Sequence, residues 1–289
     1  MKKVLSVVLS LILVTGMLMC FSACGGSGAA KNITIAVPND GTNEGRALML
    51  LEDLGLITLD EAAGVTATKN DIKENPYNIE INEVEAANIP NMLKDVSFAV
   101  INGNYALDAG LSPASDALAT EEHDSYSKYS NLIAVKEGNE TTDKTKALVA
   151  AVSSKQVADF ITEKYSGSVV ADIANQTDGY DETVDYEALK GEKITIGASA
   201  TPHAEILEVV KEILAEKEIT LDVKIFADYI QPNMAVESDE LDANYFQHLP
   251  YLVDFNEANS THIANVLLVH AEPMGIYAGQ MTDLAQIKG

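Results

Sequence analysis

Cysteine and aromatic residues are scarce in this chain, and basic residues are few. Cysteine occurs only at positions 20 and 24, so no disulfide can form within the part of the chain that follows residue 24. Tryptophan is absent, and aromatic residues make up 6% of the sequence. The 19 Lys and Arg residues face 44 Asp and Glu residues, which leaves a formal net charge of −25. Such acidity argues against binding to nucleic acid or to an anionic membrane surface.

Motifs of the common nucleotide-binding, metal-dependent and serine enzymes are also absent. The sequence has no GxGxxG, GxxxxGKS/T, HExxH, CxxC or GxSxG pattern. Its five histidines, at positions 123, 203, 248, 262 and 270, show no metal-ligand spacing, and we expect neither a metal nor another cofactor. A catalytic dyad at His248 would need an activated nucleophile, and the sequence points to none. These absences indicate a binding protein rather than an enzyme.

Long apolar runs are confined to the first 19 residues. Lys2 and Lys3 precede an apolar stretch from Val4 to Met19, and Phe21-Ser22-Ala23-Cys24 then resembles a bacterial lipobox. We therefore expect a lipoprotein signal peptide over residues 1–23, lipidation of Cys24, and a flexible tether over residues 24–31. This would anchor the protein to the cell membrane on its extracytoplasmic side. The alternative is an ordinary secretory signal that is cleaved nearby.

The remaining sequence has a globular composition, and its 289 residues allow two α/β domains or one large one. Residues 33–51 predict a strand that ends at Pro38, a polar loop, and a helix with Arg46 in its first turn. A helix N-terminus disfavours a cation, so this arginine is a candidate for binding an anion. On spacing alone, a solvated surface arginine is the more common case.

The same strand–loop–helix pattern recurs at residues 193–217. Lys193–Ala198 predicts a strand, and Pro202–Lys217 predicts an amphipathic helix with Thr201 as its N-cap. Two such units suggest two similar α/β lobes with mainly parallel sheets, in which ligands bind at the carboxyl ends of strands. Further strands are predicted at 79–84, 98–101, 131–135, 223–226 and 265–269, and further helices at 86–93, 106–111, 143–165 and 282–289.

Two later stretches differ in composition from the rest. Residues 241–248 concentrate aromatic and amide side chains, which is typical either of a pocket wall or of a core aromatic pair with surface amides. Residues 167–191 are polar and lack periodicity, and they are predicted to be a linker.

Several stretches together resemble the methionine-binding lipoproteins of ABC importers, the NlpA/MetQ-type family. The resemblance rests on the sequences at residues 35–48, 100–106, 201–207, 228–233, 241–248 and 272–275. Relative to that family, the order of the two halves is exchanged. The block that begins at Lys193 would open the family's mature chain, and residues 167–191 join its usual ends. The sequence therefore resembles a circularly permuted member.

The resemblance implies a type II periplasmic-binding-protein fold of α/β class, circularly permuted, with two lobes. One lobe would comprise residues 32–130 plus 276–289, and the other residues 131–275, including the 167–191 linker. Two crossover segments, near residues 129–135 and 272–278, would join the lobes.

The family's function implies that this chain captures L-methionine or a close relative between its lobes, as a monomer. It would deliver this ligand to an ABC permease driven by a separate ATPase. The alternatives are a methionine-containing dipeptide, another amino acid, or an adhesion role at the cell surface. The ligand-binding residues implied by the resemblance are Arg46, Asn102, Asn43, Asn39, Tyr245, Phe246, His248 and Tyr229. Arg46 and Asn102 are the first choices for the ligand's charged ends, and the aromatic residues for its thioether.

Overall fold

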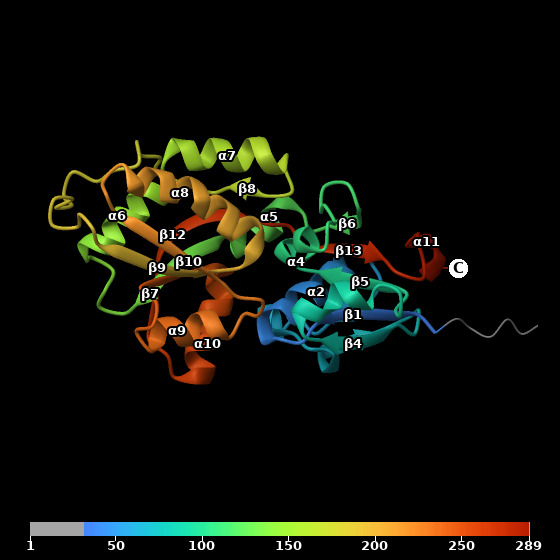
Figure 1. Cartoon of the computed structure of the whole chain (residues 1–289). Helices are drawn as coiled ribbons and strands as arrows, with labels where there is room; N and C mark the ends of the chain where they lie inside the picture. The colour runs from blue at the N-terminus through green and yellow to red at the C-terminus, as the bar shows by residue number, and fades with distance from the viewer. Residues whose placement is uncertain (1–31, 289) are drawn as a thin grey trace, which may run out of the picture. The chain divides into compact units, whose positions relative to one another are not determined.

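Figure 1 shows the computed structural model of the chain, which describes residues 32–288. The expected signal peptide, Cys24 and the tether lie outside these residues. Residues from Ile33 onward form one compact unit. Within the described residues, no helix is both long enough and apolar enough to cross a membrane.

The first of two large sheets contains five strands in the order β4-β1-β5-β13-β6. β1 pairs in parallel with β4 and β5, whereas β13 pairs antiparallel with β5 and β6. We call this sheet and its helices the first lobe. Its strands are β1 (Thr34–Pro38), β4 (Glu80–Val84), β5 (Phe98–Ile101), β6 (Ala117–Thr120) and β13 (Gly275–Ala278).

The second sheet contains six strands in the order β10-β9-β11-β7-β12-β8, and with its helices it forms the second lobe. β9 pairs in parallel with β10 and β11, and the other three pairings are antiparallel. The strands are β7 (Asn131–Lys136), β8 (Val170–Ala171), β9 (Lys193–Ala198), β10 (Thr220–Ile225), β11 (Ala243–His248) and β12 (Ile263–Ala271). A separate small pair joins β2 (Thr58–Leu59) and β3 (Ile72–Glu74).

Helices cover both sheets, and in Figure 1 those of the second lobe lie above and below its strands. In the first lobe and its connections they are α2 (Gly41–Asp53), α3 (Ile89–Met92), α4 (Gly103–Asp108), α5 (His123–Tyr126) and α11 (Ala285–Lys288). In the second lobe they are α6 (Asp143–Val152), α7 (Lys155–Tyr165), α8 (Glu205–Ala215), α9 (Gln231–Glu237) and α10 (Leu249–Asn259). Each lobe has its own apolar core, and α11 contributes Ile287 to the core cluster that also contains Ile33.

The expected α/β class is confirmed, but the expectation of mainly parallel sheets is wrong. The chain crosses from the first lobe to the second between β6 and β7, and it returns between β12 and β13. These strands, β7 and β13, run antiparallel to their neighbours on both sides. The strands predicted at 98–101 and 193–198 match β5 and β9.

Three predicted helix starts are also wrong. α2 begins at Gly41 because Asp40 caps it, its carboxylate accepting a hydrogen bond from the Asn43 N–H at 3.0 Å. Arg46 therefore lies in the second turn. α4 begins at Gly103 rather than at 106. A π-helical turn over Ala200–Ala204 precedes α8, which begins at Glu205 with Ala204 as its N-cap, whereas the sequence predicted a start at Pro202 with Thr201 as the cap.

The segment 167–191 is packed against the second lobe along much of its length. Val169, Ile173, Val184 and Leu189 are buried in that lobe's core. β8 pairs with the end of β12. Between these anchors, several residues are exposed, including Asn175 and Glu182.

Candidate functional site

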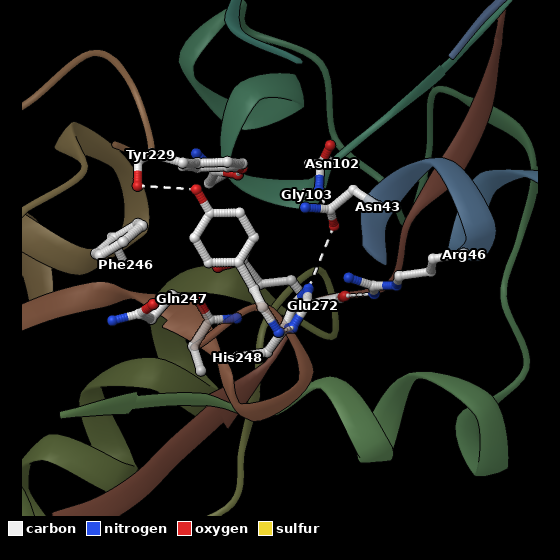
Figure 2. A pocket seen from close by; sticks show the side chains of 12 residues that line it. Asn43, Arg46, Asn102, Gly103, Tyr229, Phe246, Gln247, His248 and Glu272 are labelled. Atoms are coloured by element: carbon white, nitrogen blue, oxygen red, sulfur yellow. Dashed lines mark hydrogen bonds between the residues drawn. The ribbon is translucent and has the colours of Figure 1, made fainter. Parts of the chain in front are cut away.

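A cavity lies where residues from both lobes meet. It has about 340 Å³ of empty volume, part of it open to solvent. Polar side chains at strand ends and helix starts of the first lobe face aromatic and amide side chains of the second (Figure 2). The lining residues are Asn43, Arg46, Asn102, Gly103, Asn104, Asn131, Tyr229, Phe246, Gln247, His248, Tyr251 and Glu272.

Arg46 is buried and already paired within the protein. Its Nε and Nη2 donate to the two carboxylate oxygens of Glu121 at 2.8 and 2.6 Å, and Nη2 also donates to the Glu272 carbonyl at 2.7 Å. The guanidinium lies 4.4 Å from the centre of the Tyr129 ring. Arg46 Nη1 has no hydrogen-bond partner among the described residues, so this nitrogen is available to donate to a ligand. The helix-dipole argument for Arg46 therefore fails, since Glu121 compensates its charge directly.

Asn43 connects the two lobes. Its side-chain oxygen accepts hydrogen bonds from Asn102 Nδ2 at 2.8 Å and from His248 Nε2 at 3.2 Å (Figure 2). The Tyr251 main-chain N–H donates to His248 Nδ1, so the proton of the neutral ring lies on Nε2. Burial, with the nearby Arg46 charge, holds the pKa of His248 well below 6.5. Asn102 Oδ1 is buried without a partner, and it is available to a donor.

Aromatic rings form the opposite wall of the cavity. Tyr229, Phe246 and Tyr251 pack on one another with ring centroids 5.8 to 6.1 Å apart. The Tyr229 hydroxyl donates to Asn104 Oδ1 of the first lobe at 2.6 Å, which leaves Asn104 Nδ2 buried and without a partner. This wall offers flat, polarizable surface to an apolar or thioether group, with unused amide donors beside it.

Glu272, in the crossover between β12 and β13, is the buried carboxylate of the cavity wall. Its Oε1 accepts a hydrogen bond from His270 Nε2 at 2.7 Å and lies 3.7 Å from His203 Nε2. Burial raises the pKa of Glu272 above 4.5, against the opposing effect of His203 and Arg46. Burial also lowers the pKa of His203 and of His270 to about 3, so both rings are neutral.

These three side chains could also hold a metal ion. His203, His270 and Glu272 each offer one ligand atom, and these atoms lie within 4.8 Å of one another. However, both Nε2 atoms lie at hydrogen-bond distance from acceptors, His203 from Asn131 Oδ1 at 2.9 Å and His270 from Glu272. A metal-bound His203 would carry a buried Nδ1–H without an acceptor, which is unusual for a histidine ligand.

The structure brings six of the eight predicted binding residues together. Those that line the cavity are Arg46, Asn43, Asn102, Tyr229, Phe246 and His248. Asn39 is exposed and Tyr245 is buried in the second lobe's core, so neither lines the cavity. Sequence reasoning missed Gly103, Asn104, Asn131, Gln247, Tyr251 and Glu272, of which Gly103 and Gln247 adjoin residues that it did select.

The sequence model of the NlpA lipoprotein family matches residues 29–173 and 194–289 of the chain. The chain belongs to this family. Two curated NlpA-type relatives illustrate the similarity. The membrane lipoprotein TpN32 of Treponema pallidum is 43% identical over 137 residues, which are 47% of this chain and 50% of that protein. The D-methionine-binding lipoprotein MetQ of Salmonella typhimurium is 42% identical over 138 residues, 47% of this chain and 50% of that protein.

Solved NlpA-type structures show the same partial coverage. A nutrient-binding protein from Burkholderia cenocepacia, bound to methionine, is 38% identical. The match covers 49% of this chain and 59% of that one, with a TM-score of 0.42. The chain thus spans about half the length of the curated relatives that it matches. The family expected from the sequence is confirmed.

Proposed function

We propose that this chain is the substrate-binding lipoprotein of an ABC importer and captures methionine in the cavity between its lobes. The observation that carries the proposal is the cavity itself, in which a buried arginine, several amides and an aromatic wall converge. Family membership and the names of relatives, which describe D-methionine-binding proteins, support the same ligand. We therefore propose binding rather than catalysis.

The ligand's groups each find a matching part of the cavity. Its carboxylate would meet Arg46 Nη1 and the unpartnered Asn104 Nδ2, and its ammonium would donate to the unpartnered Asn102 Oδ1. The thioether would lie against Tyr229 and Phe246, since a polarizable sulfur packs favourably on aromatic rings. Asn43 and His248, already hydrogen-bonded across the lobes, would hold the closed arrangement around the ligand.

Delivery requires partners that this chain does not supply. We propose that residues 1–23 are removed and that a lipid on Cys24 anchors the protein outside the cell. A membrane permease with a separate ATPase would then accept the ligand. Replacing Cys24 by alanine is expected to release the protein from the membrane fraction, and retention after this change would contradict the anchor.

We also propose that the chain is a circular permutant. The family model matches two segments, and residues 174–193 between them lie outside the match. Each curated relative aligns over about half of its own length, as expected when the order of the two halves differs.

Calorimetric titration with L-methionine, D-methionine and Gly-Met tests the ligand. We expect one molecule of free methionine to bind per chain, with a smaller response from Gly-Met. Tight binding of Gly-Met, without binding of free methionine, would show that the ligand is a dipeptide and not methionine. The absence of a thermal shift with every amino acid and dipeptide would instead favour a non-transport role at the cell surface.

A further inference from the structure

Behind the cavity wall, a chain of hydrogen bonds runs from the second lobe's core to Glu272. The Tyr245 hydroxyl contacts His270 Nδ1, and His270 Nε2 contacts Glu272 Oε1 at 2.7 Å. All three residues are at most 4% exposed. Because these groups are buried and contact one another, the position of each proton is set by the neighbouring group.

The direction of these two hydrogen bonds follows from the groups at the two ends, Tyr245 and Glu272. When Glu272 is ionised, its carboxylate only accepts, so His270 Nε2 carries the proton and donates it to Glu272. The neutral ring then has a lone pair on Nδ1, to which the Tyr245 hydroxyl donates. Both hydrogen bonds therefore point toward Glu272.

Glu272 retains acceptor capacity on the cavity side. A carboxylate offers about four lone-pair sites, of which His270 Nε2 uses one and the Asn104 main-chain N–H another. Among the described residues, its ion-pair partners are only the two neutral histidines, because Arg46 contacts the Glu272 main chain instead. A buried carboxylate that lines a cavity without a cationic partner is suited to a cationic group of the ligand.

Gly103 makes room for this carboxylate. A Cβ atom at residue 103 would lie 2.6 Å from Glu272 Oε2 and 2.7 Å from Glu272 Cβ. The first lobe therefore closes against Glu272 only because residue 103 has no side chain.

We propose that Glu272 binds the ammonium group of the ligand, and that His270 and Tyr245 are positioning residues that hold its carboxylate in place. The inference rests on the proposed function, because it assigns one group of an amino-acid ligand. An ammonium-binding carboxylate at Glu272 makes the site selective for ligands with a free amine, whether or not they also carry a carboxylate.

Three probe ligands separate this role from general loss of structure. Methionine carries both charged groups, methioninamide lacks the carboxylate, and 4-(methylthio)butanoate lacks the ammonium. Glu272→Gln is expected to weaken methionine and methioninamide about tenfold to a hundredfold, the range for a charged hydrogen bond. The affinity for 4-(methylthio)butanoate should stay within about threefold.

The positioning residues should show the same selectivity with smaller effects. Tyr245→Phe and His270→Ala should weaken the two amines about threefold to tenfold, and His270→Gln, which keeps an N–H donor, should recover part of the loss. His262→Gln serves as the matched control, since that histidine is 66% exposed and bonds to Glu237. Equal weakening of all three ligands in Tyr245→Phe or Glu272→Gln would overturn the proposal.

Nitrogen-15 NMR of the ligand-free protein tests the hydrogen-bond chain without any ligand. We expect His270 to be neutral at pH 7 with its proton on Nε2. A proton on Nδ1, or a zinc ion bound at one equivalent in its place, would overturn the proposal. If the wild-type protein binds no methionine while this tautomer is present, the proposed function fails and the hydrogen-bond chain stands.

Discussion

Arg46 and Glu121 form a bidentate ion pair that also holds the crossover between β12 and β13. Besides accepting from Arg46, the Glu121 carboxylate accepts a hydrogen bond from the Met274 main-chain N–H at 2.7 Å. Arg46 in turn donates to the Glu272 carbonyl. The pair therefore links α2, the segment after β6, and the crossover that leads to Glu272.

Breaking this pair on one side should be costly. Glu121→Ala leaves the Arg46 guanidinium buried and unpaired, and we expect it to lower the free energy of unfolding by about 3–5 kcal/mol. The double variant Arg46→Met/Glu121→Leu removes both charges and should be less destabilised than Glu121→Ala. Urea denaturation measures both. A single variant that loses less than about 1 kcal/mol would contradict a tightly coupled pair.

The same double variant separates stability from binding. Because it lacks Arg46 Nη1, it should fold and yet bind methionine at least about tenfold more weakly than the wild type. Calorimetry under conditions where both proteins are folded provides the measurement. Unchanged affinity would remove Arg46 from the ligand site.

A methyl group at residue 103 should disturb the site, because it would clash with both Cβ and Oε2 of Glu272. Gly103→Ala forces Glu272 and the adjoining main chain to move, so methionine binding should weaken at least about tenfold. Gly41→Ala is the matched control at a helix start, because the nearest atom to its Cβ would be a carboxylate oxygen of Asp254, at 3.3 Å. Equal affinities of the two variants would show that the Glu272 position does not matter.

Glu44 predicts how stability depends on pH. Burial, opposed by the Lys69 main-chain N–H, raises the pKa of Glu44 from 4.5 to about 7. The folded state therefore holds a proton that the unfolded state has already lost, and this contribution to stability disappears as the pH rises from 4.5 through 7.

Glu44→Gln should remove that loss. The unfolding free energy of the variant minus that of the wild type should increase by about 1–3 kcal/mol from pH 5 to pH 8. Its amide oxygen can still accept from the Lys69 N–H, which Glu44 Oε1 does at 2.8 Å. Denaturant titrations at the two pH values measure this difference. If the variant is stabilised relative to the wild type more at pH 5 than at pH 8, the predicted pH dependence is wrong.

The segment 167–191 should tolerate a cut. Glu182 and Thr183 are exposed, and each side of this bond is anchored, by Thr177 hydrogen bonds on one side and by Val184 and Leu189 on the other. A protease site inserted between residues 182 and 183 should leave methionine binding within about threefold after cleavage. An equivalent site inside α8 is the control and should abolish folding. Loss of binding after cleavage at 182 would contradict the permutation as proposed.

Local patterns were sufficient for much of the fold. Alternation and apolar runs placed β5 and β9, and polar residues at strand ends pointed to Asn43, Asn102 and Arg46. They could not place Tyr245, because composition does not show which face of β11 is turned to the core. The same limit applies to α2, where Asp40 moved the helix start and placed Arg46 in the second turn.

The sequence by itself determined the family, the α/β class and most of the cavity's polar residues, since these depend on local order and on recognisable blocks. Only the tertiary structure decided that Glu121 pairs with Arg46 and that His270 and Tyr245 support Glu272. These partners lie on different helices, strands and crossovers, up to 75 positions apart in the Arg46–Glu121 pair. Which strands become neighbours depends on packing across both lobes, and no periodicity in the chain records it.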